Sequence, residues 1–150
     1  MGISSSLDVS ASGLTAERVW MDVISNNIAN ANTTRTANGL PYRREEVIFE
    51  SRGGNSFRSI LDSMRGDPIS SSPGEGVKVA AIVSDTSPFR RVYMPGSPDA
   101  DKNGYVMMPN VQPVMEMVNL IASNRAYDAG VTAMNAAKQM QVKALSIGQA

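Results

Sequence analysis

The sequence contains no cysteine and no histidine among its 150 residues. Disulfides, zinc sites of the Cys/His kind, thiol nucleophiles and histidine-dependent catalytic triads are therefore excluded. The chain also lacks an excess of either charge, since 14 basic residues balance 14 acidic ones. That balance argues against nucleic acid or an anionic membrane as a partner, because both require a basic surface.

Long hydrophobic runs are missing as well. No stretch approaches the roughly eighteen apolar residues of a membrane-spanning helix, and the first twenty residues have neither a basic region nor a continuous apolar one. We therefore expect no transmembrane segment and no cleaved signal peptide. Gly-x-Ser-x-Gly elbows, Ser-x-x-Lys pairs and phosphate-binding glycine loops are also absent. We expect no enzyme, no cofactor, no metal and no small-molecule substrate.

Helical periodicity marks both ends of the chain. Residues 3–30 and 113–147 each carry a heptad pattern of mainly apolar residues, and the second pattern opens on a proline suited to a first helical turn. Polar Asn124, Lys138 and Gln141 interrupt the second pattern. These patterns predict two long helices that pair as a coiled coil. Because both stripes are narrow and partly polar, we expect several copies to pack side by side. The predicted assembly-interface residues are Leu7, Leu14, Met21, Ile24, Ile28, Met117, Leu120, Tyr127, Val131, Met134 and Leu145.

The middle of the chain has a different composition. It contains every proline except Pro113, which disfavours long helices there. Alternating and β-branched residues predict strands over 42–50 and 76–85, with shorter strand-like pieces over 89–94 and 104–108. Residues 57–66 are read as a short helix or a loop, and the stretch 50–76 as a flexible loop.

These patterns predict an α+β protein in two parts. Residues 1–32 and 111–150 form a coiled-coil helical domain, and residues 33–110 form a small β-rich middle domain. Because helices of this length exceed the dimensions of a compact globule of this size, we expect an elongated molecule.

The first predicted helix ends in a run of asparagines, ISNNIANANTT, over residues 24–34. A C-cap through Asn30 or Asn32 in a left-handed conformation explains one of them. A buried polar layer that fixes helix register explains Asn26 or Asn27. A catalytic role lacks an accompanying acid, base or nucleophile. The composition leaves the first two interpretations open.

The motif DADKNGY resembles the start of a calcium-binding loop. Asp99, Asp101 and Asn103 place oxygens at alternate positions, and Gly104 suits the turn. The acidic residue expected at the twelfth loop position is replaced by Asn110, and a simple turn between two strands explains the same residues. A calcium-binding interaction module that uses Asp99, Asp101 and Asn103 is therefore the alternative functional hypothesis.

Two stretches carry a family resemblance. SNNIANANTT, residues 25–34, is similar to the N-terminal signature of the flagellar rod and hook family of axial proteins. EMVNLIASNRAYDAGVTAMNAAKQMQVKAL, residues 116–145, is similar to the C-terminal signature of that family. The interposed RTANGLPYRRE and residues 87–111 resemble the proximal-rod members in particular. The motif residues at the N-terminal end are Asn26, Asn27, Ile28, Ala29, Asn30 and Thr33.

The resemblance implies a structural subunit of the bacterial flagellar proximal rod. Its terminal helices would polymerise into the inner tube of a drive shaft that transmits torque, and its middle domain would face outward. It implies export without a cleaved signal peptide by the flagellar type III export apparatus, and a place in the basal body within the periplasm. The implied partners are further copies of the chain, other proximal-rod proteins, the rod base near the MS ring, and the distal rod.

Overall fold

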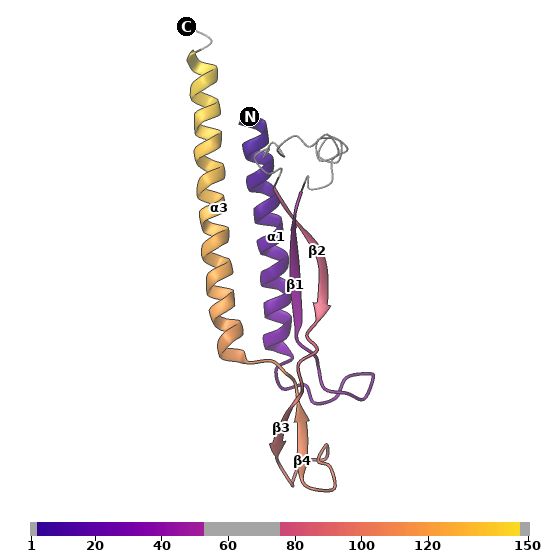
Figure 1. The fold of residues 1–150 in the computed structure, drawn as a ribbon. Coiled ribbons are helices and arrows are strands. Elements are labelled where there is room, and N and C mark those ends of the chain that lie inside the picture. Colours follow the sequence, from indigo (N-terminus) through magenta and orange to yellow (C-terminus); the bar gives the residue numbers. More distant parts are fainter. Residues whose placement is uncertain (1–2, 53–75, 148–150) are drawn as a thin grey trace, which may run out of the picture. The chain divides into compact units, whose positions relative to one another are not determined.

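The computed structural model describes residues 3–52 and 76–147. Its described elements are α1 (Ile3–Ala29), β1 (Glu45–Ser51), β2 (Val77–Ser84), β3 (Arg90–Tyr93), β4 (Tyr105–Met108) and α3 (Pro113–Ile147) (Figure 1). The two long terminal helices and the small middle with antiparallel strands confirm the predicted α+β class. The helix or loop predicted over 57–66 lies outside the described residues, as does most of the flexible loop predicted over 50–76. No helix within the described ranges is long and apolar enough to cross a membrane.

The end of α1 is capped by an asparagine side chain. The Nδ2 group of Asn30 donates to the carbonyl of Asn26 at 3.0 Å and to the Oδ1 atom of Asn26 at 2.9 Å. The Asn26 carbonyl also accepts from the backbone amide of Asn30 at 3.1 Å, so the carboxamide adds a second bond at the last helical turn. No described residue other than glycine has a positive φ. The prediction of a left-handed C-cap is therefore wrong, because Asn30 caps the helix through its carboxamide.

The strands form two antiparallel pairs, β1 with β2 and β3 with β4. β1 begins at Glu45, whereas the sequence predicted a strand from residue 42. The difference has a physical cause, because the backbone amides before β1 bond outside the sheet. The amide of Tyr42 donates to the carbonyl of Thr33 at 3.0 Å, and that of Arg44 donates to Oδ1 of Asn110 at 2.8 Å.

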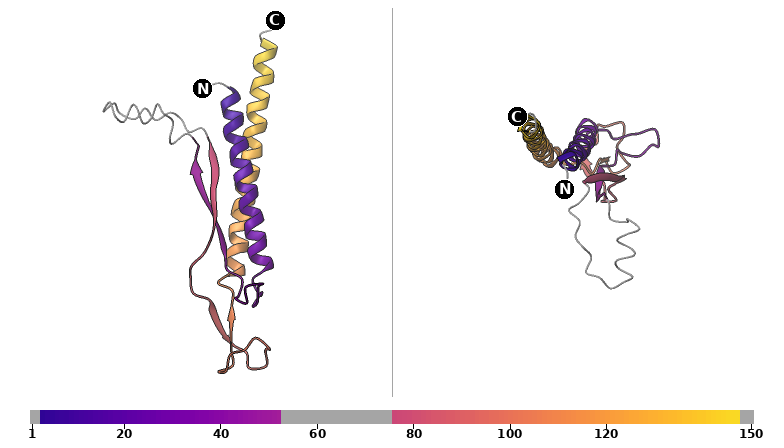
Figure 2. Two further views of the ribbon diagram at one scale, coloured as in Figure 1. Left: turned by 90° about the vertical axis from the view of Figure 1, so that its right-hand side faces the viewer. Right: turned by 90° about the horizontal axis from the view of Figure 1, so that it is seen from above.

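The chain divides into two compact units, and both helices contribute to each unit. In the first unit, which holds residues 3–18, 49–52, 76–80 and 125–147, α1 lies between α3 and the strand ends (Figure 2). Toward the strands, the Ser12 hydroxyl accepts a hydrogen bond from the amide of Val77 at 3.1 Å. Toward α3, the side chain of Leu14 lies against Gly130.

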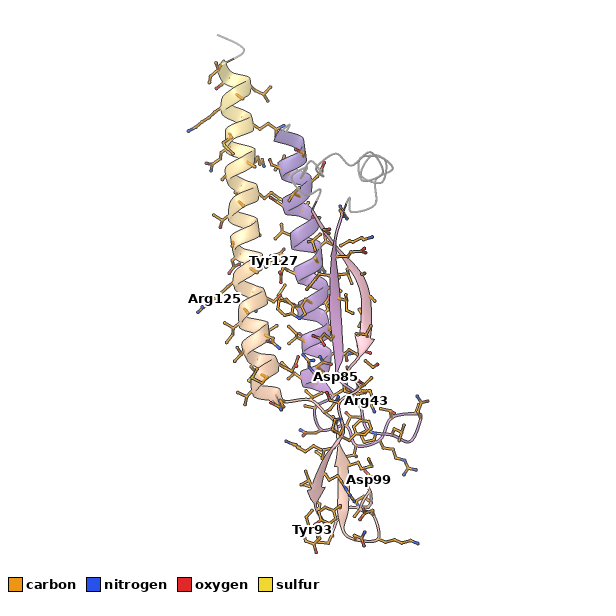
Figure 3. All side chains as sticks on the ribbon, in the orientation of Figure 1. Arg43, Asp85, Tyr93, Asp99, Arg125 and Tyr127 are labelled. Atoms are coloured by element: carbon orange, nitrogen blue, oxygen red, sulfur yellow. The ribbon has the colours of Figure 1, made fainter. Side chains whose placement is uncertain are left out.

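The inner side of α3 consists of small or polar residues at heptad spacing. Glu116, Ser123 and Ala137 are buried, and Gly130 is half-buried. Half-buried Leu120, Tyr127, Met134 and Gln141 accompany them. Figure 3 shows Tyr127 on the side of α3 that faces α1, whereas Arg125 points away. The predicted heptad pattern placed Met117, Asn124, Lys138 and Leu145 in the helix pair, but all four are exposed on the single chain. Small residues take their place because they allow close approach of the two helices.

The second unit, residues 19–48 and 81–124, contains most of the buried apolar side chains. Val92, Val106 and Met108 share one face of the β3–β4 pair, because Val92 pairs with Val106 and Met108 lies two residues further along β4. Val106 and Met108 are buried. The core members of this unit are Val23, Ile24, Ala31, Val47, Val106, Met108 and Val111.

Two helix-interior glycines test this packing. A Cβ atom on Gly13 would have no heavy atom within 4 Å, whereas one on Gly130 would lie 2.9 Å from Cδ2 of Leu14. We expect Gly13→Ala to raise the free energy of unfolding by about 0.5–1 kcal/mol. We expect Gly130→Leu to lower it by about 1–3 kcal/mol, because the larger side chain forces the helices apart. Urea unfolding followed by circular dichroism measures both. Equal effects at the two sites would contradict the close contact at Gly130.

Candidate functional site

The carboxamide of Asn27 joins the end of α1 to the start of β1. Its Nδ2 group donates to the carbonyl of Glu45 at 2.8 Å, and its Oδ1 atom accepts from the amide of Glu45 at 2.9 Å. Oδ1 also accepts from the Tyr42 hydroxyl at 3.0 Å, and Nδ2 also donates to Oε2 of Glu116 at 3.3 Å. Asn27 therefore bonds both the N–H and the C=O group of Glu45, as the backbone of a neighbouring strand would. A carboxamide suits this position because it both donates and accepts.

Glu116 is a buried carboxylate in the first turn of α3, and only 1% of its surface is exposed. Its Oε1 atom accepts from Nε of Arg44 at 2.7 Å, and Oε2 accepts from Asn27. Hydrogen bonding to Glu116 raises the pKa of Arg44 above its ordinary value. The position near the N-terminus of α3 also favours a negative charge. The buried charge is therefore compensated by a guanidinium, a carboxamide and the helix end.

A second set of polar contacts holds the loop after β2. Arg43 donates to the carbonyl of Asp85 at 2.8 Å, and its guanidinium lies 4.4 Å from the ring centroid of Phe89. Figure 3 shows Arg43 and Asp85 close together. Asn110 donates to the same carbonyl at 3.2 Å. Hydrogen bonds from Ser87 to the carboxylate of Asp85 lower the pKa of Asp85. We call Asn27, Arg44, Asn110 and Glu116 the polar junction.

An open cavity of about 560 Å³ adjoins the polar junction. Its two acidic side chains, Asp85 and Glu116, both bond neighbouring residues and are not free to act on a substrate. The Ser87 hydroxyl donates to the carboxylate of Asp85, whose lowered pKa makes it a weak base. Across residues 3–52 and 76–147, no group of three or more acidic side chains is arranged to hold a metal ion. The arrangement supports a structural role for the junction.

The DADKNGY motif forms a hydrogen-bonded turn. Oδ1 of Asp101 accepts from the amides of Asn103 and Tyr105 at 2.8 and 2.9 Å, and Oδ2 accepts from Arg91 at 3.2 Å. The backbone bond from Tyr105 is the main reason that the pKa of Asp101 is lowered. The Oδ2 atom of Asp99 accepts from the hydroxyl of Thr34 at 2.7 Å. These contacts explain the motif as a turn, and nothing in them favours calcium.

The structure separates the predicted assembly residues into three groups by exposure. Met117 and Leu145 are exposed, at 52% and 65% of their surfaces. Ile24 is buried in the second unit. The remaining predicted residues are half-buried: Leu7, Leu14, Met21, Ile28, Leu120, Tyr127, Val131 and Met134.

The asparagine motif is also divided by the structure. Asn27 is buried, Asn26 and Ala29 are exposed, and Asn30 and Thr33 are half-buried. Of the two candidates for a buried polar layer, Asn27 therefore occupies the buried site. Thr33 donates to the Oδ1 atom of Asn30 at 3.2 Å and so supports the cap.

Several residues of the polar junction were missed by reasoning from the sequence. Glu116 and Arg44 are far apart in the chain, and charged residues at such positions usually lie in solvent. The heptad spacing of Glu116, Ser123, Gly130 and Ala137 was a usable signal. The seam predicted from the sequence runs one residue further along, through Met117, Asn124, Val131, Lys138 and Leu145.

Both ends of the chain match known protein families. Residues 7–35 match the family described as flagella basal body rod protein. Residues 102–147 match the family described as flagellar basal body rod FlgEFG protein C-terminal. The two matches contain most of α1 and all of α3, which carry the polar junction residues Asn27 and Glu116.

Comparison with curated proteins extends the similarity over the whole chain. The flagellar basal-body rod protein FlgC of Bacillus subtilis is 54% identical over 148 residues, which cover 96% of this chain and 97% of the relative. FlgC of Borreliella burgdorferi is 46% identical and covers 99% of each chain. FlgC of Salmonella typhimurium is 36% identical over 99% of this chain and 100% of its own length.

Calcium titration tests the turn formed by DADKNGY. Because the oxygens of Asp101 already accept bonds from Asn103, Tyr105 and Arg91, we expect no saturable transition at sub-millimolar calcium. Isothermal calorimetry on the unaltered chain and on Asp101→Ala is expected to give the same background heats. A stoichiometric transition that Asp101→Ala abolishes would instead establish calcium binding.

The ionisation of Tyr42, whose hydroxyl donates to Asn27 of the polar junction, can be followed as the pH is raised. Burial raises its pKa from 10.0 to about 12, with the charges of Glu45 and Glu116 adding to the effect. Because the folded chain holds this proton more tightly, the resulting stability is fully present below pH 10 and is lost as the pH rises through 12. We expect tyrosinate absorbance to show one late-ionising tyrosine that Tyr42→Phe removes. Loss of an early-ionising tyrosine in Tyr42→Phe, with the late phase retained, would contradict the burial of this hydroxyl.

Proposed function

The chain belongs to the FlgC family of flagellar basal-body rod proteins, and we propose that it is a structural subunit of the proximal rod. It assembles with further copies of itself and with other basal-body proteins through its terminal helices. The observation that carries this proposal is the exposed apolar surface of α3. A helix that were simply the outer face of a soluble monomer would carry mainly polar side chains there.

The exposed apolar residues occur on α3 in both units. In the second unit they are Val114, Met115, Met117, Val118 and Ile121. In the first unit they are Met140, Val142, Leu145 and Ile147. Methionine is suited to such a surface because its flexible side chain adapts to neighbours of different shape. Burial of one Leu or Met side chain contributes about 1.5–3 kcal/mol, so many such contacts along a helix stabilise an assembly.

The contact between copies is proposed to be heterologous, with different surfaces of the chain meeting in successive copies. Such contacts generate open helical arrays when the rotation between copies does not close into a ring. Torque applied to the array would be divided over many parallel helix–helix contacts. The predicted assembly residues Met117 and Leu145 are available for these contacts because neither is covered within the chain.

Family membership supports the finer details of this proposal. The helical parts, residues 1–32 and 111–150, would form the inner tube, and residues 33–110 would face outward or contact neighbouring rod proteins. The rod base near the MS ring would lie on one side along the axis, and the distal rod on the other. The chain would reach the periplasm through the flagellar type III export apparatus without a cleaved signal peptide.

Leu145→Asp tests assembly without disturbing the fold of the single chain, because 65% of this side chain is exposed. We expect the variant to be exported normally and to be absent from purified basal bodies, so that swimming in soft agar is lost. Each copy would lose about 1.5–3 kcal/mol of apolar burial and would place a charge in the contact. Export and incorporation are measured by immunoblotting of secreted and basal-body fractions.

The matched control is Gln139→Asp, which introduces the same charge at an exposed polar position of α3. This variant is expected to swim normally. Motile cells that carry Leu145→Asp in normal basal bodies would show that this part of α3 is not an assembly surface.

A further inference from the structure

The seam between α1 and α3 repeats every seven residues. On α1 the repeated positions are Leu7, Leu14, Met21 and Ile28. On α3 they are Glu116, Ser123, Gly130 and Ala137, with Leu120, Tyr127, Met134 and Gln141 beside them. Apart from Glu116, sliding one helix by a heptad therefore places apolar or small side chains opposite each other again. Apolar packing alone distinguishes poorly between such registers.

A slide of one heptad moves a helix by about 10 Å along its axis. A feature that occurs once along the seam can distinguish the observed pairing from such neighbouring registers.

The polar junction occurs once along the seam and is not repeated in the other heptads. We propose that Asn27 and Glu116 are positioning residues that fix the register of α1 against α3. Through its bonds to Glu45, Asn27 also holds the start of β1 against the end of α1. Asn27 uses both its donor and its acceptor groups on Glu45, Tyr42 and Glu116. Glu116 accepts from Arg44 and Asn27. All of these contacts form within the second unit.

A slipped register carries a specific penalty. If α3 moved by one heptad, Glu116 would take the position that Ser123 now holds, where the exposed fraction is 0%. The carboxylate would be buried there without Arg44 and Asn27. A buried charge without a partner is strongly unfavourable. Asn27 would in turn lose one of its partners. The junction thus penalises the wrong pairings as well as stabilising the right one.

The absence of cysteine makes the register directly measurable. Asp22→Cys and Ile121→Cys introduce the only two thiols, at exposed positions of α1 and α3 in the second unit. Nitroxide labels on these thiols report the distance between the helices by double electron–electron resonance. With the junction intact we expect one narrow distance. With Asn27→Leu and Glu116→Leu together, we expect a second population that differs by an axial shift of about 10 Å.

Three further variants separate a register role from a general loss of stability. Asn26→Leu makes the same substitution at the exposed neighbour, and Glu116→Gln retains an acceptor for Arg44. Both are expected to keep the single distance. Glu116→Ser gives this position the same residue as Ser123 and is expected to populate the slipped register.

A single unchanged distance in both junction variants, Asn27→Leu/Glu116→Leu and Glu116→Ser, would overturn the proposal. Loss of helical circular dichroism in both would also overturn it, because a register device is not needed for helix formation itself. The register of the isolated chain is a different property from rod assembly, so failure here would leave the Leu145→Asp experiment unaffected.

Discussion

The hydrogen bonds between the Asn27 carboxamide and the main chain of Glu45 are the contacts on which the second unit depends. They give Glu45, the first residue of β1, hydrogen-bond partners on α1 for both its N–H and its C=O group. They also bring the end of α1 to Glu116, so that the same side chain serves the helix pair and the sheet. Arg44 completes the arrangement, because its guanidinium compensates the Glu116 carboxylate and its carbonyl accepts from the amide of Asp85. Three distant segments therefore meet through one set of polar groups.

The ends of the chain could be predicted well from the sequence, because helical periodicity is a local property. The α3 bounds agree with those predicted, and α1 ends one residue earlier than expected. β1 starts later than predicted, since the amides of Tyr42 and Arg44 bond to partners that lie elsewhere in the chain. The inner side of α3 was misassigned for a related reason. Close helix packing favours Ser, Gly and Ala, which a search for large apolar residues passes over.

The candidate site was predictable in part. The asparagine run was identified as a cap or a buried layer, and the structure assigns Asn30 to the cap and Asn27 to the buried position. The partners of Asn27 could not be predicted, because Tyr42, Glu45 and Glu116 become its neighbours only through tertiary folding. The charged groups of Asp85, Asp101 and Glu116 are used within the chain, while large apolar side chains of α3 are left exposed. This division suits a protein whose surface is completed by other subunits.

The distance along the chain between the partners of the polar junction has a consequence for the order of folding. Asn27 and Glu116 are 89 residues apart, and contacts of such long range form late because a large loop must be closed first. A growing chain that ends before Glu116 has the residues of α1 and the strands but lacks the carboxylate that bonds both Asn27 and Arg44. The contacts that join α1, the start of β1 and α3 can therefore be completed only when most of the chain is present.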